Sequence, residues 1–147
     1  MTAAAIGAKL LRLPCACANL RRAARAVTRL YGDELRSTGL EPTQFTLLMA
    51  LNLAGEVTQG ELGRNLALDS TTLTRTLRLL LARGWIRAAA GRDRRERHLS
   101  LTPKGREKFR RAQPAWERAQ QRLERTLGQT QWQQLAATLE EVALAAR

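Results

Sequence analysis

Apolar residues recur along the chain at spacings of three and four, which is the period of an amphipathic α-helix. The first stripe predicts a helix over about residues 15–37, which Gly39 would end. Its members are Leu20, Ala24, Val27, Tyr31 and Leu35. A second helix is predicted over 43–54, because Pro42 suits its start and Gly55 suits its end.

The middle of the chain predicts two short helices joined by a tight turn. Thr58 and Glu61 have the spacing of a capping box, which would begin a helix that ends near Leu66. Asp69 is a favourable N-cap for the next helix, over 70–83. The inward face of that helix would carry Leu73, Leu77 and Leu80, and its outward face would be polar.

A hairpin and a long helix follow. Two strands are predicted at 85–89 and 97–101, with Gly91 in the turn between them. The dipeptide Thr102-Pro103 then favours the start of a helix, which we expect Pro114 to kink. The apolar stripe of this helix consists of Phe109, Ala112, Trp116, Ala119, Leu123 and Leu127.

A last helix is predicted after Gly128, from a second capping box at Thr130 and Gln133. Its apolar stripe consists of Trp132, Leu135, Leu139 and Val142. No Pro/Gly/Ser-rich linker divides the chain. The pattern therefore predicts a single domain over residues 1–147, mainly α-helical with a small β-hairpin.

Charge narrows the range of partners. The net charge is +12, from 25 Lys and Arg against 13 Asp and Glu, so the chain should attract nucleic acid or an anionic membrane surface. No apolar run approaches the ~18 residues of a membrane span. Lys9 and Arg12 interrupt the apolar N-terminal stretch, which argues against a signal peptide and favours a cytoplasmic protein.

Enzymatic chemistry finds little support. The sequence shows no Gly-rich phosphate loop, no nucleophile with its base and no closed set of metal ligands, so we expect neither an enzyme nor a cofactor. Two cysteines do not make a disulfide framework. We interpret His98, the one histidine, as a surface or phosphate-adjacent residue.

A polar helix presented beside a basic hairpin suits a DNA groove and its phosphates. In the helix, the residues expected to meet base edges or phosphates are Ser70, Thr71, Thr72, Thr74, Arg75 and Arg78. In the hairpin, they are Arg92, Arg94, Arg95 and Arg97. Taken alone, each set is also explained as a solvated polar face or a solubilising charge run. The two sets in succession favour DNA.

The same segments resemble the MarR family of bacterial transcription regulators. The residues that carry the resemblance are LDSTTLTRTLRLLLARGWI, 68–86, and DRRERHLSLTPKG, 93–105. The resemblance implies a winged-helix DNA-binding part over 40–105, with dimerisation helices over 8–38 and 106–147. It implies a homodimer on double-stranded DNA with pseudopalindromic operators, and repression relieved by a small aromatic ligand or an oxidant.

The resemblance also assigns roles within the hairpin. Arg95 stands at the family position that enters the minor groove, where a narrow A·T-rich tract has enhanced negative potential. Asp93 stands at the family's hairpin aspartate, whose expected role is to pair with an arginine and fix the wing. Arg92, Arg94 and Arg97 are expected on phosphates.

Cys15 and Cys17 lie at the start of the first predicted helix, where the helix dipole, Arg21 and Arg22 favour a thiolate. Two residues apart on a helix, they would point to nearly opposite sides, which disfavours a disulfide. In the hydroperoxide-sensing branch of the family, Cys17 stands at the reactive cysteine and Tyr31 at one tyrosine partner, while Arg21 replaces the other. The alternative is that both cysteines pack at a dimer interface.

Two functions of different classes remain. The leading one is a homodimeric, sequence-specific DNA-binding regulator. The other is a basic protein without a regulatory role, either a nonspecific nucleic-acid binder or a thiol redox or metal-handling protein. A strong preference for one inverted repeat over bulk DNA at physiological salt distinguishes the first from the second.

Overall fold

The structure, a computed structural model, describes residues 13–91, 93 and 96–146. The prediction of a mainly helical fold with a small β wing is confirmed. In chain order, the elements are α2 (Ala16–Leu35), the 3-10 turn η1 (Arg36–Thr38), α3 (Pro42–Ala54), β1 (Glu56–Thr58), α4 (Gln59–Asn65), α5 (Ser70–Ala82), β2 (Ile86–Ala90), β3 (Arg97–Leu101), α6 (Pro103–Leu127) and α7 (Gln129–Ala145).

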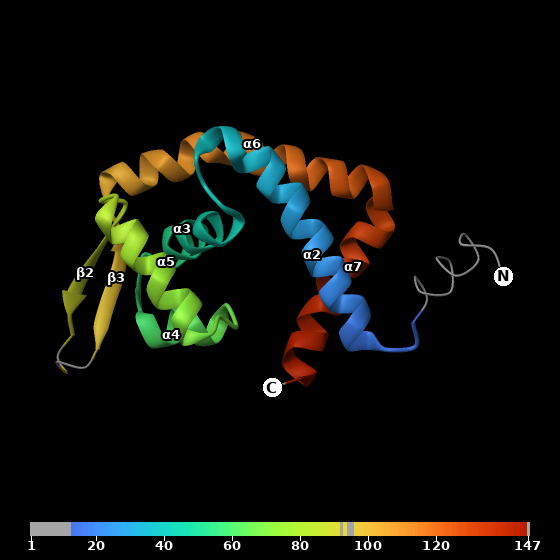
Figure 1. The fold of residues 1–147 in the computed structure, drawn as a ribbon, viewed down its shortest axis with the longest axis horizontal. Coiled ribbons are helices and arrows are strands. Elements are labelled where there is room, and N and C mark those ends of the chain that lie inside the picture. Colours follow the sequence, from blue (N-terminus) through green and yellow to red (C-terminus); the bar gives the residue numbers. More distant parts are fainter. Residues whose placement is uncertain (1–12, 92, 94–95, 147) are drawn as a thin grey trace.

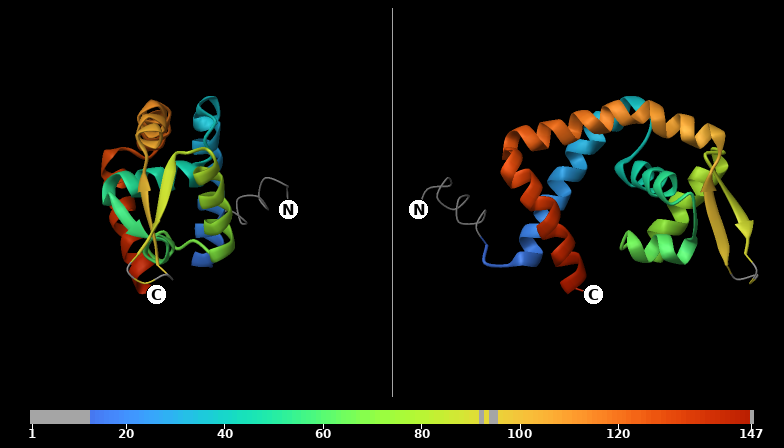
Figure 2. Two further views of the ribbon diagram at one scale, coloured as in Figure 1. Left: turned by 90° about the vertical axis from the view of Figure 1, so that its left-hand side faces the viewer. Right: turned by 180° about the vertical axis from the view of Figure 1, so that it is seen from behind.

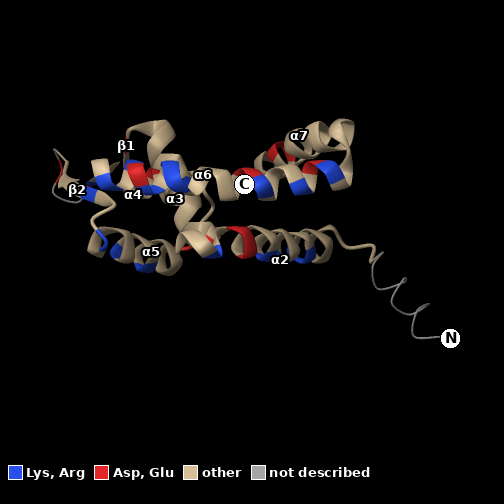
Figure 3. Ribbon diagram, turned by 90° about the horizontal axis from the view of Figure 1, so that it is seen from above, with Lys and Arg blue, Asp and Glu red and all other residues tan. Residues whose placement is uncertain are grey.

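The elements form two parts that the long helix α6 connects (Figure 1). At one end of α6 lies a winged part, made of α3, α4, α5 and the strands. From the other half of α6, the helices α2 and α7 extend as arms, and they lie on different sides of α6 when seen from above (Figure 3). The side chains that face DNA in our prediction all belong to the winged part.

The strands form an antiparallel sheet in the order β1-β3-β2, so the predicted hairpin gains a third strand. Val57 of β1 and Ala88 of β2 both lie opposite Leu99 of β3. Leu99 is buried, so this face of the sheet covers the core. The β2 strand begins at Ile86, one residue later than predicted, while the bounds of β3 match the prediction.

One hydrophobic core runs from the winged part into α6. The ring centroid of Phe45 on α3 lies 5.2 Å from that of Phe109 and 6.0 Å from that of Trp116, both on α6. The residues predicted to face inward from α5 are indeed buried: Leu73, Leu77 and Leu80. Because the aromatic rings interlock across the boundary, α3 and the first half of α6 are held as one packed unit.

Three predicted helix starts are confirmed by their hydrogen bonds. Thr58 and Glu61 form a capping box at α4, with each side chain bound to the backbone N–H of the other residue. Asp69 caps α5, and Thr102 caps α6.

The predicted capping box at Thr130 is wrong. The N-cap of α7 is Gly128, and the helix begins directly at Gln129. Gly128 has a φ of 81°, a conformation that glycine adopts without steric cost, so the chain turns within one residue. Thr130 therefore already lies inside the first turn. Pro114 lies within α6, which continues through it as one helix and arches across the molecule (Figure 2).

The junction between the sheet and α6 depends on a close backbone approach. The backbone N–H of Thr102 donates to the carbonyl oxygen of Trp85 at 3.1 Å. Gly105 faces the same carbonyl, and a Cβ atom at this position would lie 1.8 Å from that oxygen. Lys108, one turn further, donates from Nζ to the carbonyl of Thr38 and lies 4.9 Å from the centroid of the Trp85 ring.

The two arms leave apolar surface exposed. α7 contains no buried residue, and Leu139 in the middle of its predicted stripe is 46% exposed. The other exposed large apolar residues of the arms and their ends are Leu13, Leu20, Val142 and Leu144. A run of exposed apolar side chains of this kind marks a surface that another chain or a ligand covers.

The close approach at Gly105 yields a stability prediction. We expect Gly105→Ala to lower the free energy of unfolding by ~3 kcal/mol, because the added methyl group would meet the rigid Trp85 carbonyl. Urea unfolding followed by tryptophan fluorescence measures this change. The matched control is Lys104→Ala at the exposed neighbouring position, which should stay within ~0.5 kcal/mol of the unsubstituted protein. Equal stability of the two variants would contradict the prediction.

Candidate nucleic-acid interface

The N-terminal end of α5 is fixed by Asp69. Its Oδ2 accepts a hydrogen bond from the Thr72 hydroxyl at 2.6 Å, and its Oδ1 accepts one from the Thr72 backbone N–H at 2.8 Å. These hydrogen bonds hold the pKa of Asp69 below its usual value. Thr72 was predicted to contact DNA, but its hydroxyl proton is engaged in this cap. Thr72 therefore orients the end of the helix, and its contact with DNA remains a prediction.

The other predicted residues of α5 lie on its exposed face. They are Ser70, Thr71, Thr74, Arg75 and Arg78. The opposite face is buried in the core. From Ser70 to Arg78 this exposed face covers about 12 Å of helix, at 1.5 Å per residue. That length is sufficient to follow base edges and the adjoining phosphates along a groove.

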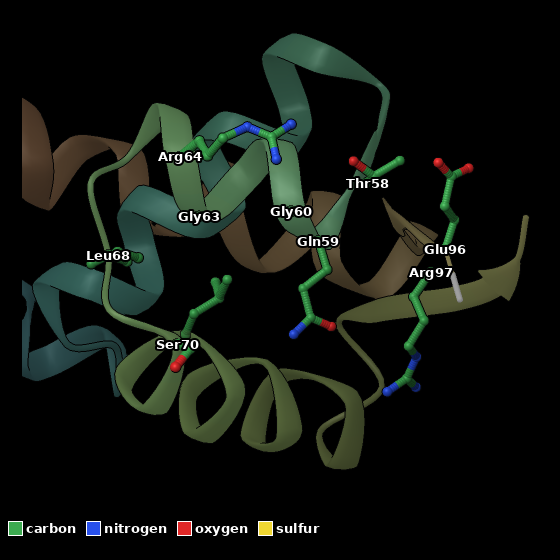
Figure 4. Close-up of a pocket in the computed structure, with 10 residues that line it drawn as sticks. Thr58, Gln59, Gly60, Gly63, Arg64, Leu68, Ser70, Glu96 and Arg97 are labelled. Atoms are coloured by element: carbon green, nitrogen blue, oxygen red, sulfur yellow. The ribbon is translucent and has the colours of Figure 1, made fainter. Parts of the chain in front are cut away.

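A cleft of about 790 Å³ opens between α4, the start of α5 and the wing (Figure 4). Arg97 lines this cleft from β3, together with Gln59 of α4 and Ser70 of α5. A smaller recess of about 200 Å³ continues along α5, and it is lined by Gln59, Thr74, Arg78 and Arg97 among others. The structure thus brings the reading helix and the wing arginine to one surface, although they are about 20 residues apart in sequence.

Arg64 belongs to the same cleft, and it was not predicted. It lies on α4, exposed, one turn after Gly60. A sequence signal existed, because residues 60 and 64 share one face of a helix that starts at Thr58. Glu61 is the acidic residue of this turn. Its hydrogen bonds with the Thr58 side chain and backbone lower its pKa and engage its carboxylate in the capping box.

Three of the predicted wing arginines lie outside the described residues: Arg92, Arg94 and Arg95. Asp93 is described and exposed, and its carbonyl accepts a hydrogen bond from the backbone N–H of Glu96 at 2.9 Å. The N–H of Gly91 donates to the Glu96 carbonyl, also at 2.9 Å. Asp93 therefore takes part in closing the wing turn through its backbone. Its pairing with an arginine remains a prediction.

The structure corrects one premise about the cysteines. Cys15 is not in the helix but is its N-cap, with an extended backbone at φ −136°, and Cys17 is the second residue of α2. The argument against a disulfide, which placed both on one helix, therefore no longer applies. Both thiols are free and exposed. Cys17 and Tyr31 lie about 21 Å apart along α2, at 1.5 Å per residue.

Tyr31 has a partner within the chain, because its hydroxyl donates to Oε1 of Gln120 on α6. Partial burial raises the pKa of Tyr31 above its usual value. Among residues 13–91, 93 and 96–146, His, Cys, Asp and Glu form no cluster of three or more that suits a metal ion. In the same part of the chain, no helix has the length and apolar character that crossing a membrane requires.

The fold and this surface define a winged helix-turn-helix protein, with the polar, exposed face of α5 beside a basic wing. Residues 38–96 match the model of the MarR family. The chain belongs to the MarR family of transcriptional regulators. Because its relatives are transcriptional regulators, the prediction that the chain is not an enzyme is confirmed.

Similar proteins cover different shares of the chain. An uncharacterised HTH-type transcriptional regulator of Bacillus subtilis, YwoH, is 30% identical over 90 residues, which span 61% of this chain and 66% of that protein. The multiple antibiotic resistance protein MarR of Salmonella typhimurium is 38% identical over 78 residues, or 52% of this chain and 54% of that protein. The crystal structure of the M. tuberculosis transcriptional regulator MosR in complex with DNA is 35% identical. It has a TM-score of 0.80 and covers 90% of this chain and 96% of that one.

The cap at Asp69 yields a prediction with a defined pH dependence. Asp69→Ala should lower the midpoint of thermal unfolding at pH 7, whereas Asp69→Asn, which keeps an N-cap oxygen but not its charge, should lower it less. The pKa of Asp69 is lowered by folding, so its stabilising effect is present above the pKa of the unfolded chain and is lost as pH falls through the folded value. Unfolding midpoints measured from pH 7 to pH 3 should therefore converge for the wild type and Asp69→Ala. A constant difference would contradict this account.

Proposed function

We propose that the chain is a homodimeric, sequence-specific DNA-binding regulator that represses transcription in the cytoplasm. The observation that carries this proposal is the single surface where the exposed face of α5 meets Arg97 of the wing. It is supported by the 35% identical MosR of M. tuberculosis, which was crystallised with DNA. Lys and Arg residues along α5, α2 and α6 add a general attraction for a polyanion (Figure 3).

Each part of the surface receives a role in this proposal. The N-terminal half of α5 enters the major groove, where Thr71, Thr72 and Arg75 meet base edges. Arg78 and Arg97 lie further along the recess and bind phosphates. In the wing, Arg95 enters the minor groove. Arg92 and Arg94 bind phosphates, and Asp93 fixes the turn.

The arms supply the second half of the proposal. α7 and the N-terminal part of α2 carry apolar side chains that the described residues of the chain leave exposed. Two copies that cover these stripes with each other would form a dimer with two reading helices. Such a dimer fits a pseudopalindrome whose half-sites are ~34 Å apart, one turn of DNA. Residues 40–105 are then the DNA-binding part, and 8–38 with 106–147 form the dimer.

The reading helix is tested by selecting bound sites from random DNA. We expect the wild type to prefer one inverted repeat over bulk DNA by ~1,000-fold or more at physiological salt. Arg75→Ala should change the preferred bases at fixed positions of each half-site, because its fork reads base edges. Arg78→Ala should keep the consensus and reduce the slope of log affinity against log salt by ~1, the loss of one phosphate contact.

The control for this selection is Arg110→Ala, which removes one exposed positive charge from α6, where Arg110 pairs with Glu107. It should change neither the consensus nor the salt slope. Binding of all DNA alike by the wild type would favour the alternative of a nonspecific nucleic-acid binder. An unchanged consensus for Arg75→Ala would mean that Arg75 contacts only phosphate.

The dimer is tested with Leu139→Arg, which places a charge in the exposed stripe of α7. We expect the wild type to be a dimer at micromolar concentration and the variant to be a monomer, as measured by light scattering after gel filtration. The control is Glu140→Arg at the neighbouring exposed position, which should remain a dimer. A monomeric wild type would contradict the proposal.

Release from DNA is proposed to follow binding of a small aromatic ligand or oxidation of Cys17. The observation that favours oxidation is the exposed thiol of Cys17 in the first turn of α2, an arm of the proposed dimer. A hydroperoxide would oxidise the thiolate to a sulfenic acid and leave as the alcohol. Tyr31, about 21 Å away along its own helix, could meet Cys17 only from the partner chain.

We expect one equivalent of an organic hydroperoxide to weaken operator binding by the wild type at least ~10-fold, equivalent to ~1.4 kcal/mol. Cys17→Ser should bind DNA equally well before and after treatment, and Cys15→Ser serves as the matched control. Fluorescence anisotropy with labelled operator measures both. If the treated wild type bound the operator as tightly as before, both cysteines would be packing residues. A small ligand would then be the agent that releases the protein from DNA.

A further inference from the structure

His98 lies on the outer face of the wing sheet, where its ring is placed between two carboxylates. Its Nδ1 lies 3.3 Å from Oε1 of Glu56 on β1, and its Nε2 lies 3.7 Å from Oε2 of Glu96 beside the wing turn. The side chain is 30% exposed. Glu56 and His98 share this face, because Glu56 pairs with Ser100 and Thr58 pairs with His98 in the β1–β3 register.

The ring of His98 also packs against Gly91, the first residue after β2. A Cβ atom on Gly91 would lie 2.9 Å from Nε2 and 3.0 Å from Cδ2 of His98, and 3.0 Å from Cβ of Glu96. Contacts at these distances leave no room for a side chain at Gly91. The imidazole thus touches or approaches three segments: β1, the end of β2 and the last residue of the turn.

Neighbouring residues of β3 serve opposite faces of the sheet. Arg97 lines the cleft beside α5, while His98, one residue later, points to the other face with Glu56. Thr58, the partner of His98 in the register, lies at the edge of the cleft and lines it, whereas His98 does not. A direct contact of His98 with the same phosphates as Arg97 is therefore disfavoured by the alternation of the strand. The sequence-based interpretation of His98 is that of a surface or phosphate-adjacent residue. The side chain is 30% exposed, and its position beside a phosphate stays a prediction.

We propose that His98 is a positioning residue of the wing: it ties Gly91, just after β2, and Glu96, just before β3, to Glu56 of β1. The proposal rests on the proposed DNA-binding function, because the turn and Arg97 meet DNA there. It gives a structural role to Glu96, an acidic residue that lines the cleft proposed to face DNA (Figure 4). The carboxylate belongs to the latch formed by His98, Gly91, Glu56 and Glu96.

The two ring nitrogens face different carboxylates, so the imidazole bridges Glu56 and Glu96 across the wing. The nearby carboxylate of Glu61 is engaged by the side chain and backbone of Thr58, and these hydrogen bonds lower the pKa of Glu61. Every acidic side chain named around the ring therefore has a structural partner.

The first test measures the wing without DNA. Hydrogen exchange should be faster in His98→Ala than in the wild type at the amides of Gly91 and Glu96, which close the turn. His98→Gln, which keeps a donor of similar reach, should restore most of the protection. Unchanged exchange in His98→Ala would overturn the latch whatever the DNA result. Faster exchange together with no DNA binding by the wild type would overturn the proposed function and leave the latch intact.

The second test separates positioning from direct contact. His98→Ala should weaken operator binding about three- to tenfold at every salt concentration, the range for losing one such contact, with an unchanged salt slope. Arg97→Gln is the matched control and should reduce the slope by ~1. A lower slope for His98→Ala would instead show that the ring contacts phosphate, which would overturn the proposal.

A double-mutant cycle tests whether His98 and Glu96 act together on DNA affinity. In the His98→Ala background, Glu96→Gln should strengthen DNA binding, because it only removes a negative charge from the cleft. In the wild-type background, the same substitution also breaks the latch, so the gain should be smaller or reversed. Equal gains in the two backgrounds would mean that His98 and Glu96 act independently, and the latch would be wrong.

Discussion

The contact between the first turn of α6 and the carbonyl of Trp85 determines how the winged part meets the long helix. Gly105 allows this approach because no side chain intervenes, and Thr102 binds the same carbonyl from the cap. Lys108 then joins the Trp85 ring to the carbonyl of Thr38, beyond the end of α2. The contacts of the sheet, α6 and η1 therefore come together at Trp85. The reading surface is oriented relative to the arms mainly through this junction.

Elements with local causes could be predicted from the sequence. The caps at Thr58, Asp69 and Thr102 depend on hydrogen bonds within three residues, and all three are confirmed. The failure at Thr130 has a local cause as well, since the left-handed conformation of Gly128 removed the loop that the prediction assumed. What escaped prediction depends on contacts between distant segments. Arg64 in the cleft and the carboxylates around His98 are examples, because sheet pairing brings Glu56 and His98 together.

The acidic residues of the winged part show how a cationic surface accommodates carboxylates. Asp69 and Glu61 accept hydrogen bonds from helix starts, so their charges offset the unpaired N–H groups there. Their lowered pKa values show that folding stabilises the ionised forms. On α6, Glu107 has a pKa of about 2, because Arg110 and Arg111 both donate to it. The chain thus uses its few acids to shape the backbone and to space its arginines.

The arched helix α6 gives the molecule the mechanics of a lever. With 25 residues it is about 37 Å long, and it carries the reading surface at one end and the arms at the other. A turn of only ~6° about the arm end would displace the far end by ~4 Å, slightly more than the ~3.4 Å that each phosphate of a strand advances along the DNA axis. Small changes where two chains meet would therefore be magnified into a full step along the DNA backbone.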